Sequence, residues 1–230
     1  MTTVAIITAR GGSKRIPRKN IKLFLNKPII AYSITSALNS GIFEEVMVST
    51  DDQEIADIAK KYGASIPFLR SAENSGDFAG TAEVIIEVIS EYRNIGKSFD
   101  VACCIYPTAP FVTADKLKNA LRLLRETNAD SVLPITEFSY PILRSVKVND
   151  QGKIEMNWPQ YYSSRSQDLP KSFHDCGQFY FLNVNSLFEH RKLFMPNSFP
   201  VIVPETEVQD IDNETDWKIA EMKYRLLHEQ

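Results

Sequence analysis

Short apolar runs rich in Val and Ile alternate along the chain with longer segments in which apolar residues recur at the helical period. The first run, TVAIIT at 3–8, is continuous and therefore typical of a strand buried on both faces of a parallel sheet. Similar runs predict strands at 44–50, 65–70, 99–107, 130–136 and 199–204, and a strand followed by a helix over 177–188. Such alternation predicts a mainly parallel sheet covered by helices.

The segments between these runs carry the start and stop signals of helices. Segment 28–41 begins with Pro28 and ends with Gly41, which are favoured at the first helical position and just after the last one. Segment 51–63 begins with acidic residues and ends with basic ones, as the helix dipole favours. Periodic segments predict further helices at 82–93, 113–127 and 214–230. Because crossovers between parallel strands are right-handed, we predict a three-layer α/β sandwich.

The pattern changes between about 137 and 175. This segment has short alternating runs and three prolines but no helical period. The segment is too poor in apolar periodicity to form a core of its own, so we expect its Tyr and Trp side chains to be buried against another surface; they are Tyr140, Trp158, Tyr161 and Tyr162. We predict an extended arm inserted into one domain that spans residues 1–230, since a chain of this length usually builds one core.

Composition excludes several classes of protein. Hydrophobic residues at 43% and charged residues at 24% are ordinary values for a globular protein, and a pI near 5.7 argues against a protein that coats nucleic acid. No stretch approaches the ~20 apolar residues that span a bilayer, and the first apolar run is too short for a signal peptide. Cys103, Cys104 and Cys176 lack zinc-ligand spacing, so we expect core residues in a reducing, cytoplasmic compartment.

Residues 9–22, here called the basic loop, concentrate positive charge after the first strand. ARGGSKRIPRKNIK has six basic side chains in fourteen positions. Ligands of open α/β sheets bind outside the carboxyl ends of strands, where Gly11 and Gly12 can direct backbone N–H groups at phosphate oxygens. Arg10, Lys14, Arg15, Arg18 and Lys19 can neutralise several negative charges, which predicts a polyphosphate ligand. The GxxxxGK[ST] and GxGxxG patterns are absent, and the alternative is a solvated basic turn.

The basic loop resembles the signature of the CMP-sialic acid synthetase family, the cytidylyltransferases that activate acidic sugars. Arg10, Ser13, Lys14, Lys19 and Asn20 match that signature one by one. The resemblance extends to segments 46–64, 67–77, 106–111 and 209–217, and so covers nearly the whole chain. RIPRKNIK, YSSRSQDLP at 162–170 and FHDCGQFYF at 173–181 look most like the branch that activates pseudaminic acid, a bacterial nine-carbon sugar acid.

The resemblance implies a Rossmann-like fold of the nucleotide-diphospho-sugar transferase type and transfer of CMP from CTP to a nine-carbon 2-keto sugar acid. Pseudaminic acid is our first expectation for this acceptor, with N-acetylneuraminic and legionaminic acids as alternatives. Attack on an α-phosphorus depends mostly on positioning and charge, and Arg10 and Lys19 suit that catalytic task. We expect nucleotide contacts from Arg10, Gly11, Gly12, Ser13, Lys14, Lys19, Asn20, Arg70 and Thr81. For Arg70 the alternative is a surface charge at a strand end, because only Asp77 of the neighbouring motif supports it.

We expect residues near the acceptor sugar at a position where this sequence departs from the family pattern, and on the arm. Tyr106 stands where the family has Gln, which points away from ordinary sialic acid; a packing role is the equal alternative. Arg165 offers a guanidinium fork for the carboxylate, against the alternative of a surface ion pair. We also expect Gln178 at the sugar. His174 is the one candidate base, but a structural role is favoured, and a metal-bound oxygen is the other option.

The motif VQDIDNETDW predicts a metal site. Asp210 and Asp212 lie two residues apart, so on extended chain both carboxylates point to one side while Ile211 points to the other. Oxygen ligands of this kind suit Mg²⁺, with Mn²⁺ as a substitute, bridging carboxylates to nucleotide phosphates. The alternative is that Asp212 or Asn213 caps the last helix with Asp216 as its partner, and both roles can coexist.

Two other functions remain open, a nucleotide-sugar glycosyltransferase and a non-catalytic nucleotide-binding module. The first normally places its Asp-x-Asp motif beside a central strand, whereas here that motif lies near the carboxyl terminus. The second needs neither an acidic pair nor an arm. The family resemblance further implies a homodimer in which the arm reaches the partner subunit and contributes residues such as Arg165.

Overall fold

A seven-stranded sheet forms the centre of the computed structural model, which describes residues 1–76 and 79–228. The strand order is β11-β6-β10-β5-β1-β4, and β9 pairs with β6 beside this path. Their bounds are β1 (Thr3–Thr8), β4 (Glu45–Ser49), β5 (Val101–Ile105), β6 (Ser131–Glu137), β9 (Phe173–Asp175), β10 (Phe179–Asn183) and β11 (Ser198–Ile202). Strands β4, β1, β5, β6 and β11 share one direction, and β9 and β10 run against it. The predicted mainly parallel sheet is confirmed.

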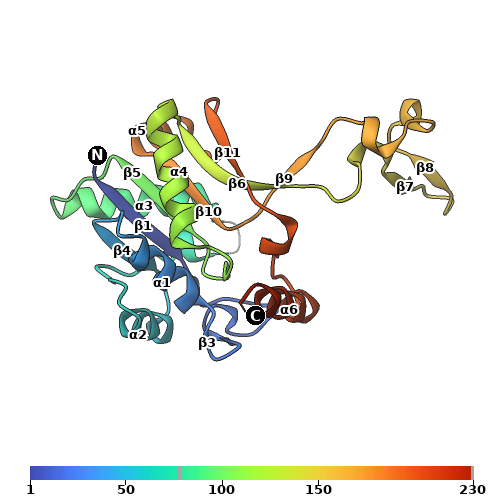
Figure 1. Cartoon of the computed structure of the whole chain (residues 1–230). Coiled ribbons are helices and arrows are strands. Elements are labelled where there is room, and N and C mark those ends of the chain that lie inside the picture. Colours follow the sequence, from blue (N-terminus) through green and yellow to red (C-terminus); the bar gives the residue numbers. More distant parts are fainter. Residues whose placement is uncertain (77–78, 229–230) are drawn as a thin grey trace.

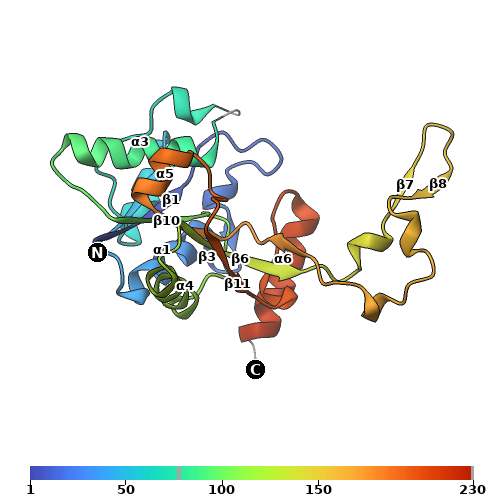
Figure 2. The ribbon, with the colours of Figure 1, turned by 90° about the horizontal axis from the view of Figure 1, so that it is seen from above.

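Helices cover both faces of this sheet (Figure 2). One face packs against α1 (Ile30–Ser40), α2 (Gln53–Lys61) and α4 (Ala114–Thr127), and the other against α3 (Thr81–Asn94) and α5 (Val184–His190). The neighbours Cys103 and Cys104 belong to opposite cores, as the two-residue period of a strand requires. The helices on both faces confirm the three-layer sandwich, and the burial of Cys103, Cys104 and Cys176 as free thiols confirms their core role.

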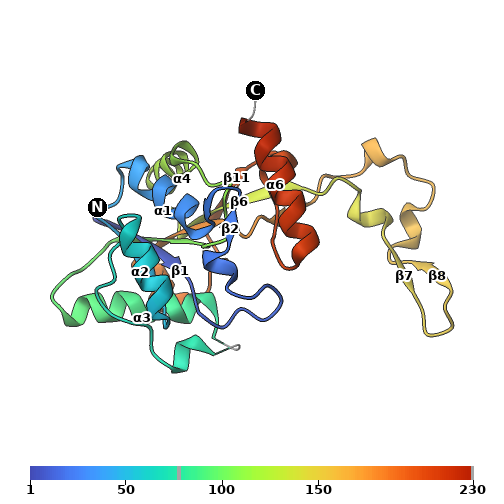
Figure 3. The ribbon, with the colours of Figure 1, turned by 90° about the horizontal axis from the view of Figure 1, so that it is seen from below.

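A third, smaller core joins the basic loop to the end of the chain. It contains Ile16 and Phe24 from the amino-terminal part and Ile211 and Trp217 from the carboxyl-terminal part. Phe24 lies in a short hairpin, β2 (Leu23–Phe24) and β3 (Lys27–Pro28), and meets the Trp217 ring edge-on at 5.7 Å between centroids. Helix α6 (Glu214–His228) is thereby packed beside the loop after β1 (Figure 3).

The arm projects from the body of the molecule (Figure 1). It leaves from β6 and returns through β9, and these strands pair antiparallel, with Glu137 opposite Phe173. Its outer end is a hairpin of β7 (Val146–Val148) and β8 (Ile154–Met156), with short helical turns η3 (Ile142–Arg144), η4 (Pro159–Tyr161) and η5 (Ser166–Asp168) around it. Val148 and Ile154 are 70% and 73% exposed, so the hairpin presents apolar side chains to its surroundings.

Two predicted elements differ from the structure. Segment 65–70 makes a single bridge, Ser65 to Met47, instead of a strand, because Pro67 lacks the N–H group that a ladder needs. The helix predicted from Pro28 begins at Ile30, since Pro28 pairs with Leu23 in the β2–β3 hairpin. Within residues 1–76 and 79–228, no helix is long and apolar enough to cross a bilayer.

Candidate active site

The basic loop lies at the edge of the sheet where β1, β4 and β5 end. It lines a cavity of about 400 Å³ through Arg10, Ser13, Lys14, Arg15, Ile16, Lys19 and Asn20, opposite Tyr106, Pro107 and Thr108 of the loop after β5. A neighbouring cavity of about 220 Å³ is lined by Thr8, Arg10, Arg70, Asn74, Gly76, Ala79, Thr81 and Val84. Arg10 borders both cavities, and its guanidinium donates to the Gly76 carbonyl at 3.0 Å. We call these two neighbouring cavities together the double cavity. Most of the residues predicted to contact the nucleotide therefore line it. Asp77, the neighbouring motif residue that supports the predicted role of Arg70, lies outside the described residues.

The shape of the basic loop depends on hydrogen bonds within the loop and to the residues just before α2. Asn20 is buried and donates its amide to the Arg10 carbonyl at 2.8 Å. The Gly11 N–H donates to Asp51 Oδ1 at 2.9 Å, and a Cβ added to Gly11 would lie 2.8 Å from Asp52 Oδ2. Gly11 is therefore needed for a close approach to the start of α2, and its N–H points at a carboxylate instead of the predicted phosphate. A Cβ on Gly12 would meet no heavy atom within 4 Å.

Arg18 holds the basic loop on α2. Its guanidinium donates to Asp52 Oδ2 at 2.6 Å and Oδ1 at 2.9 Å, and also pairs with Glu54. Asp52 is the N-cap of α2 as well, since it accepts from the Ile55 N–H at 3.0 Å. The hydrogen bonds from Arg18 lower the pKa of Asp52 to about 2. Arg18 thus positions the loop, and its charge faces carboxylates instead of the phosphates for which the sequence predicts it.

Lys19 and Arg15 face the acidic pair, Asp210 and Asp212. Lys19 donates to the Ile211 carbonyl at 2.6 Å, and its Nζ lies 3.9 Å from Asp212 Oδ1. Arg15 donates to the same Asp212 oxygen at 2.7 Å. Burial lowers the pKa of Lys19, against the raising effect of Asp212 and Asp210. The basic loop and the acidic pair, nearly 200 residues apart in sequence, form one charged site.

Asn213 caps α6 and so leaves Asp212 for another role. Asn213 Oδ1 accepts from the N–H groups of Thr215 at 2.8 Å and Asp216 at 3.0 Å. In return, Asp216 accepts from the N–H groups of Asp212 at 2.9 Å and Asn213 at 3.0 Å. Ile211 is 1% exposed, as the alternation of the motif predicts. Of the two predicted capping residues, Asn213 performs the task with its side chain, and the Asp212 carboxylate contacts Arg15.

The acidic pair fits a hard divalent cation. Partial desolvation, together with the neighbouring charge of Asp212, raises the pKa of Asp210, so the site favours added positive charge. Among the described residues, no group of three or more His, Cys, Asp or Glu gathers for a metal. A cation there would take oxygen ligands from the pair and its remaining ligands from water and phosphate, as Mg²⁺ commonly does.

Tyr106 connects the loop after β5 to α3. Its hydroxyl lies 3.1 Å from Thr81 Oγ1, and its ring packs on Tyr180 with 5.5 Å between centroids. Burial raises the pKa of Tyr106, so the phenol is neutral and available as a hydrogen-bond donor or acceptor. Tyr106 both packs and lines the cavity, which combines the two alternatives for this residue.

Arg70 is held at the end of β4, since it donates to the Ser49 carbonyl at 2.6 Å and to Ser49 Oγ at 3.0 Å.

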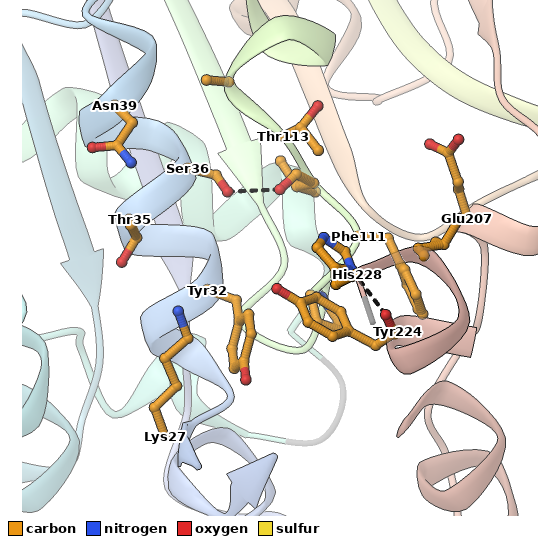
Figure 4. Close-up of a pocket in the computed structure, with 14 residues that line it drawn as sticks. Lys27, Tyr32, Thr35, Ser36, Asn39, Phe111, Thr113, Glu207, Tyr224 and His228 are labelled. Atoms are coloured by element: carbon orange, nitrogen blue, oxygen red, sulfur yellow. Dashed lines mark hydrogen bonds between the residues drawn. The ribbon is translucent and has the colours of Figure 1, made fainter. Parts of the chain in front are cut away.

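A third cavity, of about 390 Å³, lies between α1, the start of α4 and the end of α6 (Figure 4). His228 stacks on Tyr224 at one side of it, with 3.9 Å between ring centroids. Its acidic residue, Glu207, is paired with Lys116 at 2.6 Å. The described residues that line it include neither the acidic pair nor any of the basic loop. The cationic residues of the basic loop line the double cavity instead.

Comparison with known proteins identifies the family. A family model described as Cytidylyltransferase matches residues 4–202. The chain belongs to the cytidylyltransferase family. The family resemblance seen in the basic loop is thus confirmed.

Relatives with full-length coverage refine this assignment. The pseudaminic acid cytidylyltransferase of Campylobacter jejuni is 43% identical over 100% of this chain and 99% of its own. The CMP-N,N'-diacetyllegionaminic acid synthase of Legionella pneumophila is 30% identical with the same coverage. A solved CMP:2-keto-3-deoxy-manno-octonic acid synthetase in complex with CTP superposes with a TM-score of 0.71 at 17% identity, covering 100% of both chains. That last likeness supports the fold alone.

The predicted acceptor residues of this cytidylyltransferase lie in different places. Gln178 is 2% exposed and donates to the Glu207 carbonyl at 2.7 Å, so it lies beneath the site and does not line the double cavity. Arg165 is exposed on the arm, just before η5. His174 is exposed and packs on Phe138, with 4.7 Å between ring centroids. Within one chain, therefore, only Tyr106 of the predicted acceptor residues reaches the cavity.

Sequence reasoning missed the carboxylates that position the basic loop of this cytidylyltransferase. Asp51 and Asp52 directly follow β4, whose end lies beside the end of β1. Since the carboxyl ends of parallel neighbours share one edge of a sheet, the pair STDD and ARGG could have been placed together. Which arginine Asp52 would bind could not have been read from spacing.

Proposed function

We propose that this cytidylyltransferase transfers CMP from CTP to the anomeric hydroxyl of pseudaminic acid and releases pyrophosphate. The observation that carries the proposal is the charged site beside the double cavity, where Arg15 and Lys19, which line the cavity, contact Asp212 of the acidic pair before α6. The 43% identity to a pseudaminic acid cytidylyltransferase over the full chain supports this choice of acceptor. Buried free thiols fit a cytoplasmic setting.

The basic loop binds and orients the triphosphate. Arg10, Lys14 and Lys19 line the cavity and carry positive charge toward the phosphates, and Ser13 adds a hydroxyl. Because the sugar oxygen attacks the α-phosphorus directly, holding the reactants in line and neutralising phosphate charge supply most of the acceleration. Arg70 and Thr81 line the smaller cavity, where both contact the nucleotide, Arg70 at the base and ribose. Asn20 acts by fixing the Arg10 backbone.

Asp210 and Asp212 hold Mg²⁺, for which Mn²⁺ can substitute. When bound, the cation supplies positive charge to the phosphates and orients them. We expect EDTA to abolish turnover and Mg²⁺ or Mn²⁺ to restore it. Asp210→Asn and Asp212→Asn should each lose most turnover while melting within a few degrees of the parent. Turnover that survives EDTA would contradict the metal site.

The acceptor site is completed by a second subunit. Tyr106 offers its hydroxyl to the sugar at the cavity, but the carboxylate needs a cation, and Arg165 lies on the projecting arm. In a homodimer, the arm of one subunit carries Arg165 to the cavity of the other. The guanidinium then binds the sugar carboxylate through two parallel hydrogen bonds.

A pyrophosphate-release assay tests the reaction. The purified chain is given Mg²⁺, CTP or UTP, and one of pseudaminic, legionaminic or N-acetylneuraminic acid, with an acceptor-free reaction as control. We expect release with CTP and pseudaminic acid, and kcat/KM at least tenfold lower with the other acids. A preference for legionaminic or N-acetylneuraminic acid would overturn the acceptor. No release with any acid, despite CTP binding, would favour a binding module. In a separate reaction supplied with a nucleotide sugar, transfer of the sugar would favour a glycosyltransferase.

A further inference from the structure

We propose that Arg15 couples cation binding to nucleotide binding: it neutralises Asp212 in the free protein and moves to a nucleotide phosphate when a divalent cation takes its place. This inference rests on the cation site proposed for the acidic pair. Arg15 is placed to reach both the Asp212 carboxylate and a nucleotide phosphate, because it donates to Asp212 Oδ1 at 2.7 Å and also lines the cavity of the basic loop.

The two cationic neighbours of Asp212 differ in how firmly they are held. Lys19 has a 20% exposed side chain and donates to the Ile211 backbone carbonyl, so its position is fixed by the peptide chain. Arg15 has a 67% exposed side chain and contacts Asp212 through one guanidinium nitrogen. An exposed pair of this kind contributes little and is readily broken. Arg15 can therefore leave Asp212 at little cost, whereas Lys19 stays.

The cation and the Arg15 guanidinium compete for one oxygen, Asp212 Oδ1. This competition determines whether cation and triphosphate strengthen or weaken each other's binding. A cation bound at Asp212 Oδ1 displaces the Arg15 guanidinium and is repelled by it if the guanidinium has no other anion to bind. A triphosphate in the cavity supplies that anion, so it favours cation binding. By reciprocity, the bound cation releases Arg15 and thereby favours the triphosphate. Removing the guanidinium should therefore have opposite effects on the two affinities.

The test measures both affinities on the full chain. Mn²⁺ binding to the nucleotide-free protein is followed by the electron paramagnetic resonance signal of free Mn²⁺, and CTP binding in Mg²⁺ by calorimetry without acceptor. For Arg15→Gln we expect Mn²⁺ to bind about two- to fivefold more tightly, the factor that corresponds to loss of an exposed ion pair. We expect CTP to bind at least fivefold more weakly. A merely structural role of Arg15 would weaken both.

Two controls make the outcomes separable. Arg122→Gln removes the same charge from another exposed pair, Arg122 with Glu126 on α4, and should change neither affinity. Asp210→Asn should abolish Mn²⁺ binding. If Mn²⁺ binds the parent, is lost in Asp210→Asn and binds Arg15→Gln no more tightly than the parent, the Arg15 inference alone is wrong. If the parent fails to bind Mn²⁺, or binds it as well after Asp210→Asn, the cation site and the inference both fail.

Discussion

At the scale of single residues, Asp52 combines two tasks that one substitution can separate. It caps α2 and pairs with Arg18, and Asn caps helices as well as Asp does. Asp52→Asn should therefore keep the cap and lose the ion pair. The pKa of Asp52 is lowered to about 2, so its charge stabilises the folded state above the unfolded pKa of ~3.9, and this contribution is lost as pH falls toward 2.

The measurement is urea unfolding of the parent and Asp52→Asn at pH 7, 5, 4 and 3. We expect the parent to be more stable by on the order of 1 kcal/mol at pH 7, after allowance for the partly exposed guanidinium of Arg18, with the difference shrinking below pH 4. Glu126→Gln, in an exposed pair on α4, serves as the control and should change stability by less than ~0.5 kcal/mol. A constant difference across the pH range would refute the assignment.

Arg10 and Lys19 test the phosphate role directly. Replacing either with Ala removes a charge-assisted contact worth ~1.5–3 kcal/mol, so turnover should fall by about tenfold to somewhat over a hundredfold without loss of the fold. Lys22 provides a matched control in the same loop, since it pairs with Glu214 at 2.6 Å, lies over the Trp217 ring and does not line the cavity. Full activity of Arg10→Ala or Lys19→Ala in the pyrophosphate assay would show that the loop does not bind phosphate as proposed.

At the scale of elements, the sequence predicts well where one segment supplies its own signals. Helices α3 and α4 begin and end within a residue of the predicted 82–93 and 113–127, because their apolar period is long and regular. Segment 65–70 is apolar too, yet Pro67 prevents a ladder. Contacts between distant segments cannot be predicted in this way. The residues of the basic loop could be chosen from the sequence, but the partner of Arg18, Asp52, lies 34 positions away, and their contact depends on the order of strands in the sheet.

The start of α6 yields a prediction that separates capping from catalysis. Asn213→Ala removes the acceptor for two N–H groups and should lower the free energy of unfolding by ~1 kcal/mol. Asp212→Asn leaves that cap intact, so it should melt close to the parent while losing turnover. Thermal unfolding and the pyrophosphate assay, run on both variants, check this. If Asp212→Asn proved the less stable of the two, the assignment of the cap to Asn213 would be wrong.

At the scale of the whole molecule, the active site depends on contacts between the two ends of the chain. The third core packs Ile16 and Phe24 against Ile211 and Trp217, and the charged contacts of Lys19 and Arg15 lie on its edge. A loss of packing in this core would move the acidic pair relative to the basic loop without changing a charged residue of either. The arm takes no part in this arrangement within one chain, since it projects away from the body (Figure 1).

The arm therefore carries the last prediction, a homodimer. Val148, Ile154 and Tyr162 are 70%, 73% and 75% exposed, and an isolated two-stranded hairpin is marginal in water, so a second subunit gives these side chains a surface to pack on. Light scattering at micromolar concentration should give twice the chain mass of 26.1 kDa. Val148→Asp with Ile154→Asp should give a monomer that binds CTP but turns over poorly, because Arg165 no longer reaches a partner's cavity. Met222→Asp with Leu226→Asp places the same charges on equally exposed apolar positions of α6 and should remain dimeric, so a parent mass near 26.1 kDa, or an active monomer, would refute the shared site.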